Sequence, residues 1–299
     1  MLRVVAIVAI IVGLKVLAGH LPIGAQVADI SWPWDRVRTQ STASYPMPDN
    51  GVLQVSNTSG DIYVTGGSGS TVEVTVKKSA TNHNDLDAMS SHVATVADGG
   101  SANAGITITT DYPHHCSNCD LSYEITVPRG VKVIADVDSG DVHVSGTSGL
   151  IDVTSSSGDV RLTNDSGAMN VDASSGDVRL TNISGAARVQ SSSGDIDATG
   201  LSKDVDLDAS SGDVIAKYVS FDNVSTVRLR TASGSITLDV PRSFGGRITA
   251  STDSGDLSSN MKLPIHDHDS GSDVSVAVGS AKTIIDIAAS SGDITIDAR

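Results

Sequence analysis

From Gly51 onward, apolar and polar residues alternate along the chain in short runs. The clearest early runs are Val52–Val55, Ile62–Val64, Thr71–Val76, Ile106–Ile108 and Tyr123–Val127. Alternation at period two places the apolar side chains on one face of a β-strand and the polar ones on the other. The pattern therefore predicts an all-β protein made of many short strands.

One stretch departs from this alternation. Its apolar residues fall three or four positions apart, at Leu86, Met89, Val93 and Val96. This spacing is typical of one face of an α-helix, and Asn84 or Asp85 can cap its start. We therefore expect one short helix near residues 84–97, lying over an end or a side of the β structure.

A repeat of 18 residues dominates the middle of the chain. Ser-Gly-Asp recurs with its glycine at Gly140, Gly158, Gly176, Gly194 and Gly212, and midway anchors lie at Gly149, Gly167, Gly185 and Lys203. Serine precedes every anchor, and apolar residues stand two and four positions after it. The unit is thus a nine-residue strand and corner, and two units make one coil of a flattened β-solenoid.

A β-meander or sandwich with nine-residue hairpin spacing is the structural rival, because it uses the same alternation. The two kinds of corner differ, however, since Asp follows the anchor glycine regularly on one side only. A true 18-residue period favours the solenoid. Less regular copies at Gly60, Gly234, Gly255 and Gly292 extend the expected domain over residues 49–299, with regular coils at 139–217 and an exposed loop at 258–273.

The N-terminal residues 1–25 have the composition of an export segment. Arg3 precedes an apolar run that Lys15 interrupts, which predicts a signal peptide or an uncleaved membrane anchor. Residues 26–48 contain Pro33, Pro46 and Pro48 without any period, so we expect a linker there. The expected location is outside the cytoplasm, in the periplasm or at the cell surface, with membrane contact only through an uncleaved anchor.

The composition limits the classes of binding partner that we expect. The formal net charge is −15 and the pI is about 4.7, which argues against nucleic acid and against adsorption to anionic lipid. An envelope protein or a glycan is the expected partner. Aromatic residues make up only 3% of the chain, which suits thin, repetitive β layers with a core of Val, Ile, Leu and Ala.

The two cysteines, Cys116 and Cys119, lie close together after His114 and His115. In an exported protein this arrangement favours a disulfide that closes a small loop. A His/Cys metal site is the alternative, but four ligands within six residues are cramped for one tetrahedral ion. We therefore predict the disulfide and no metal site.

The Ser-Gly-Asp corners stack a row of carboxylates, at Asp141, Asp159, Asp177, Asp195 and Asp213. Neighbours about 4.8 Å apart repel by about 0.9 kcal/mol even in water. Under one hypothesis, hydrogen bonds from corner amides and serine hydroxyls offset this repulsion. Under the other, a row of Ca²⁺ ions offsets it, although calcium rolls use a different nonapeptide, G-G-x-G-x-D-x-U-x. We expect no cofactor and keep calcium as an alternative.

Catalytic signatures are scarce. There is no G-x-S-x-G elbow, and the histidines have no evident Ser or Cys partner. His266-Asp267-His268-Asp269 suits a metal or a solvated loop, and Arg161, Arg179 and Arg188 stand among aspartates as on any solvated sheet face. We therefore expect no enzyme and no catalytic residue, with a polysaccharide-acting β-helical enzyme as the alternative.

The repeats also carry a family resemblance. The Ser-Gly-Asp-Val corners, the step Val127-Pro128-Arg129-Gly130-Val131 before the regular coils and the export segment resemble the bacterial putative-adhesin family of domains of unknown function. Those domains are related to toast-rack-like domains of envelope-stress proteins. Over residues 50–299 the resemblance implies a β-solenoid on the outer side of a membrane. It also implies a non-enzymatic role in adhesion, envelope integrity or stress response.

Overall fold

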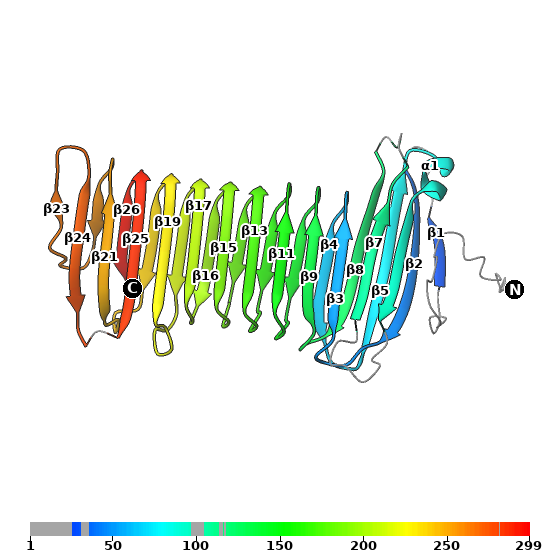
Figure 1. Cartoon of the computed structure of the whole chain (residues 1–299), viewed down its shortest axis with the longest axis horizontal. Coiled ribbons are helices and arrows are strands. Elements are labelled where there is room, and N and C mark those ends of the chain that lie inside the picture. Colours follow the sequence, from blue (N-terminus) through cyan, green and yellow to red (C-terminus); the bar gives the residue numbers. More distant parts are fainter. Residues whose placement is uncertain (1–25, 31–35, 97–104, 114–115, 117, 281) are drawn as a thin grey trace, which may run out of the picture.

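The computed structural model describes residues 26–30, 36–96, 105–113, 116, 118–280 and 282–299. In Figure 1 these residues form an elongated stack of coils, with the strands lying across its long axis. Two sheets of 13 strands each form its two sides. The expected export segment, residues 1–25, lies outside the described residues.

The first sheet, sheet A, has the spatial order β1 (Gln26–Ile30), β2 (Val37–Pro46), β5 (Thr71–Ala80), β8 (Asp120–Pro128), β4 (Ile62–Gly67), β10 (Val142–Ser145), β12 (Val160–Thr163), β14 (Val178–Thr181), β16 (Ile196–Leu201), β18 (Val214–Tyr218), β20 (Ile236–Val240), β26 (Ile294–Ala298), β22 (Leu257–Ser259). The second sheet, sheet B, has the order β23 (His266–Asp267), β24 (Ser272–Val278), β21 (Gly246–Thr252), β25 (Thr283–Ser291), β19 (Thr226–Ser233), β17 (Val205–Ser211), β15 (Ala187–Ser193), β13 (Met169–Ser175), β11 (Ile151–Ser155), β9 (Lys132–Val137), β3 (Val52–Asn57), β7 (Gly105–Asp111), β6 (Ser90–Val96).

Parallel pairing in an 18-residue register builds the middle of the stack. Val142 lies opposite Val160, and Val160 lies opposite Val178. On each strand two apolar side chains point into the core and the polar residue between them points outward; Val160 and Leu162 are fully buried, for example, whereas Arg161 is partly exposed. The parallel register confirms the predicted solenoid over the hairpin rival.

The glycines at the two corners are needed for different reasons. At the Ser-Gly-Asp corners they have a left-handed backbone, with φ of +112° at Gly176, which is costly for other residues. A Cβ there would also lie 2.2 Å from the Gly158 carbonyl oxygen of the neighbouring coil. At the opposite corner Gly167 lacks a left-handed φ, but its Cβ would lie 1.7 Å from the Gly149 oxygen. Close stacking of coils is thus the shared requirement.

Three alanine substitutions separate backbone strain from stacking. Gly69→Ala meets open space at a φ of +142°, so it tests strain alone, at about 1–2 kcal/mol. Gly167→Ala tests the contact alone, and Gly176→Ala combines both. We expect the free energy of unfolding, measured by chemical denaturation, to fall most for Gly176→Ala and least for Gly69→Ala. Equal losses at these two positions would show that stacking is not the constraint.

Both ends of the stack depart from the sequence order. The coil formed by β7 and β8 lies outside the coil of β3 and β4, and the chain then returns to place β9 and β10 on its other side. At the C-terminal end, β25 inserts between β19 and β21, and β26 inserts between β20 and β22. Antiparallel strands then close each end, through β2, β5 and β6 at one end and β24 at the other.

The predicted helix is present but shorter than expected. Helix α1 spans His83–Ala88, and its cap is Asn82, whose side chain accepts a hydrogen bond from the Asp85 amide. Beyond Met89 the chain is the extended strand β6, so the expectation of helix up to residue 97 is wrong. Buried Met89 and Val93 are four apart, a spacing that fits period two as well as a helix. Pairing of β6 with β7 decides for the strand.

The expected linker at residues 26–48 is also corrected. It contains β1 and β2, and β2 pairs with β5 over ten residues. Tyr45 and Met47 are buried there as part of the core. The strand was not evident because its alternation has small and polar residues such as Thr39 and Ser41 in place of aliphatic ones.

Candidate functional site

The row of corner aspartates forms a continuous hydrogen-bonded ladder on sheet A. In each step the Oδ1 atom of one Asp accepts a hydrogen bond from the backbone N–H of the next corner. The N···Oδ1 distances are 3.0 Å from Asp141 to Asp61, 2.9 Å from Asp159 to Asp141, 3.1 Å from Asp177 to Asp159, 3.0 Å from Asp195 to Asp177, 2.8 Å from Asp213 to Asp195 and 2.7 Å from Ser235 to Asp213. The ladder thus satisfies corner amides and places a donor against each carboxylate.

Among the described residues, the outer oxygens of these carboxylates meet cations only at one end of the ladder. The Arg161 guanidinium lies 3.0 Å from Asp159 and 3.9 Å from Asp141, and His143 lies 4.0 Å from Asp141. Asp177, Asp195 and Asp213 are exposed to solvent. One carboxylate oxygen of each step is therefore already engaged by an amide, which favours the hydrogen-bonded explanation of the ladder over the calcium alternative.

The ladder makes a prediction about one central carboxylate. Asp177→Ala removes the acceptor of the Asp195 amide, which we expect to cost about 1 kcal/mol in free energy of unfolding. Asp177→Asn keeps an acceptor and relieves repulsion, so it should cost close to nothing. Millimolar calcium or EDTA should leave the thermal midpoint of the native chain unchanged. A calcium-dependent rise that Asp177→Asn abolishes would contradict this account.

Several other charges on the outer faces are paired across coils. On sheet B, Arg188 lies 3.0 Å from Asp206, and Arg228 lies between Asp206 and Asp286 at 3.7 Å from each. On sheet A, Arg179 pairs with Asp197 at 3.5 Å. A carbohydrate-cleaving site needs two carboxylates free to act as acid and base or nucleophile, whereas these carboxylates are neutralised by neighbouring arginines. These ion pairs hold the paired side chains in a fixed array on the outer faces.

A serine, a histidine and an aspartate do meet on β6 and β7, which the sequence did not reveal. The Nε2 atom of His92 lies 3.2 Å from the Ser90 hydroxyl and 2.8 Å from the Asp111 carboxylate. In a catalytic triad the base contacts the nucleophile through one ring nitrogen and the aspartate through the other. Here both partners contact the same nitrogen, so the three residues do not form a triad.

The other titratable clusters are also partnered. His266 and His268 both lie against the Asp273 carboxylate on an exposed segment, part of the excursion expected to be a loop, which contributes the short strand β23. The structure joins the sulfur atoms of Cys116 and Cys119, whose Cα atoms are 5.7 Å apart. His114 and His115 lie outside the described residues.

Asp85 is the third member of a possible metal group with the two cysteines, and no other such group occurs within the described ranges. Sulfur atoms bonded to each other are not thiolate ligands. The oxidised pair therefore leaves only the Asp85 carboxylate to bind an ion.

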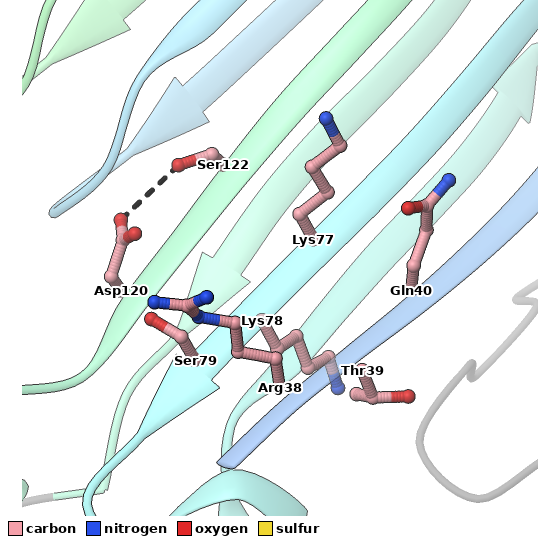
Figure 2. Close-up of a pocket in the computed structure, with 8 residues that line it drawn as sticks. All are labelled: Arg38, Thr39, Gln40, Lys77, Lys78, Ser79, Asp120 and Ser122. Atoms are coloured by element: carbon pink, nitrogen blue, oxygen red, sulfur yellow. Dashed lines mark hydrogen bonds between the residues drawn. The ribbon is translucent and has the colours of Figure 1, made fainter. Parts of the chain in front are cut away.

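A polar groove lies on the outer face of sheet A, and sequence reasoning missed it. It has a volume of about 290 Å³ and is lined by residues of β2, β5 and β8, namely Arg38, Thr39, Gln40, Lys77, Lys78, Ser79, Asp120 and Ser122 (Figure 2). Three of its eight lining residues belong to the segment expected to be a linker. The adjacent Lys77-Lys78 pair in an acidic chain was the one available signal.

One buried carboxylate also escaped the sequence analysis. Asp165 is fully buried at a corner position that Thr147, Ile183 and Leu201 occupy in the neighbouring coils. Its Oδ1 atom accepts hydrogen bonds from the Thr147 amide at 2.7 Å and hydroxyl at 2.9 Å. Its Oδ2 atom has no hydrogen-bond partner among the described residues. Burial raises the pKa of Asp165, although the hydrogen bonds from Thr147 oppose the rise.

This raised pKa predicts a pH dependence of stability. A raised folded-state pKa means that protonated Asp165 favours the native state, so its contribution is complete below the unfolded pKa and is lost as the pH rises through the folded one. Lowering the pH from 7 toward 4 should therefore stabilise the native chain relative to Asp165→Asn, which cannot ionise. Denaturation of both proteins across this range measures the difference. A constant difference would contradict burial of an ionisable group.

None of the helices in the described part of the chain is long and apolar enough to span a membrane.

Comparison with known proteins gives one family match. A family model described as Toastrack DUF4097 matches residues 53–297, and no curated protein matches the chain. Among solved structures, the chain is similar over 87% of its length to a "putative cell adhesion protein" from Clostridium sporogenes, with 12% identity, 100% coverage of that chain and a TM-score of 0.31. A "putative adhesin" from Bacteroides fragilis matches over the same share, with 16% identity, 97% coverage and a TM-score of 0.45. A "putative lipid binding protein" from Parabacteroides distasonis also covers 87%, with 12% identity, 96% coverage and a TM-score of 0.32.

Proposed function

The chain belongs to the Toastrack DUF4097 family, and from this premise we propose that it is a non-enzymatic, adhesin-like binding or structural module of the bacterial cell envelope. Its partner is an envelope protein or a glycan. Export by the N-terminal segment places it in the periplasm or at the cell surface, where it contributes to adhesion or envelope integrity.

The observation that carries this proposal is the pairing of charge along the two outer faces. Arg188, Asp206, Arg228 and Asp286 form one row on sheet B in which each carboxylate has an arginine within 4 Å. On sheet A the aspartate ladder engages its carboxylates with amides. Such faces present a fixed pattern of donors and acceptors to a partner.

The stacked coils supply the rigidity that a contact surface needs. Every regular strand is hydrogen-bonded on both sides, and its apolar residues are buried between the two sheets. A partner therefore meets a surface that is already ordered, and little conformational entropy is lost on binding.

Retention on isolated envelope glycans tests the proposal. The purified protein should bind cell-wall and extracellular polysaccharide, or an envelope protein, saturably. It should release no soluble fragments or new reducing ends over time. The double variant Arg188→Ser with Arg228→Ser breaks the paired row on sheet B, so it should weaken this binding. Arg242→Ser lies outside that row and is the control, which should bind as the native chain does. Fragment release that increases with protein concentration would establish the polysaccharide-acting alternative, and exclusive recovery in the cytosol would refute the envelope role.

A further inference from the structure

We propose that the groove on β2, β5 and β8 is a binding site for an acidic sugar, whose carboxylate is held by Arg38 and whose hydroxyls contact the polar groups around it. This inference rests on the proposed function and names a ligand class for one site within it. It concerns a different surface from the paired rows of the outer faces.

The strand register arranges the groove as two parallel rows. Arg38 lies opposite Ser79, which lies opposite Asp120 on the next strand. Gln40, Lys77 and Ser122 form the second row in the same way. Residues of one row on adjacent strands share a face of the sheet, so these six side chains surround one hollow of about 290 Å³. This volume is near the lower end for ligand pockets and suits a single sugar unit.

The groove concentrates positive charge in a chain whose net charge is −15. Lys77 is committed to an ion pair with Glu124, and the Lys78 amine donates a hydrogen bond to the Met89 carbonyl at 2.7 Å. Arg38, in contrast, is exposed and makes no ion pair or side-chain hydrogen bond with any residue whose side chain the structure describes. In Figure 2 its side chain extends over Ser79 toward Asp120. Arg38 is therefore the cation available to a ligand.

The geometry of a guanidinium selects the anion. Its planar fork of N–H groups matches a carboxylate through two parallel hydrogen bonds. Lys77 lies in the adjacent row on the same face, opposite Gln40, but Glu124 balances its charge, so Arg38 is the cation that a carboxylate would meet. A carboxylate placed here thus meets the Arg38 guanidinium, which forms no ion pair with the side chains that the structure describes.

The other lining groups favour a ligand that also carries hydroxyls. Ser79, Ser122 and Gln40 donate and accept hydrogen bonds, and the Asp120 carboxylate accepts them. Asp120 is half-buried and holds a hydrogen bond from the Ser122 hydroxyl at 3.2 Å. It would repel a purely anionic ligand such as phosphate that filled the whole groove. An acidic sugar matches both the cationic and the acidic part of the groove, with its carboxylate at Arg38 and its hydroxyls toward Asp120.

Titration calorimetry of the full chain with three probes tests the site. The probes are a hexuronic acid oligosaccharide, the matching neutral hexose oligosaccharide and inorganic phosphate. We expect the acidic oligosaccharide to bind most tightly and its affinity to fall with added salt. Arg38→Gln should weaken it by about tenfold or more, as loss of a charge-assisted pair does. Arg247→Gln, an exposed arginine of β21 on the opposite sheet and outside the paired row, is the matched control and should leave it unchanged.

The outcomes separate this site from the general function. Equal affinity for acidic and neutral oligosaccharides, tighter binding of phosphate, or an undiminished affinity in Arg38→Gln would each overturn the acidic-sugar site. Circular dichroism and the thermal midpoint of Arg38→Gln verify that the variant is folded, and Lys77→Gln provides a second measurement if it is not. If the chain is retained on envelope glycans while all three probes bind unchanged in Arg38→Gln, the groove proposal fails and the binding function stands.

Discussion

The close approach of successive corners is the constraint on which the rest of this structure depends. At each Ser-Gly-Asp corner the backbone of one coil passes so near the next that a Cβ on Gly158 or Gly176 would overlap a carbonyl oxygen. That approach brings two sets of hydrogen bonds into reach. The Val142 amide donates to the Asp159 carbonyl of the next coil at 2.9 Å, and the Asp159 amide donates back to the Asp141 side chain at 2.9 Å. Main chain and side chain thus bond neighbouring coils in opposite directions.

The same stacking creates a problem at the ends, because a parallel solenoid exposes unpaired strand edges that invite association. At both ends of this chain the order of the strands in the sheets departs from their order in the sequence. At the C-terminal end β25 and β26 lie between strands that precede them in the sequence, and antiparallel β24 pairs with β21. At the other end β2 and β5 add antiparallel strands beyond β8. These closing strands need less regular sequences than the coils, and they bear the features that break the repeat, including the disulfide loop, helix α1 and the basic groove.

This division accounts for where binding chemistry is found. Within the regular coils, a side chain on an outer face has a neighbour at the same position one coil away, and several opposite charges are partnered in this way, as Arg188 and Asp206 are. A side chain that is already in an ion pair is less available to bind a small ligand. At the N-terminal cap the neighbours across the sheet come from segments far apart in the chain, and Arg38 lies opposite Ser79 rather than opposite an acidic residue. An unpaired cation arises more readily where the repeat no longer dictates the neighbours.

The sequence alone determined the strands, the corners and the two-sided coil, because a period of 18 with apolar residues two and four positions after each anchor has few other solutions. It also located the aspartate row and offered the amide-bonded explanation that the ladder geometry favours. It did not determine the extent of α1, since the spacing of Met89 and Val93 suits a strand equally well. It also missed β2, whose small polar residues hide the alternation. The intercalated last coil, the burial of Asp165 and the groove were decided only by the tertiary structure. Each depends on which distant strands become neighbours, and local periodicity contains no information about that choice.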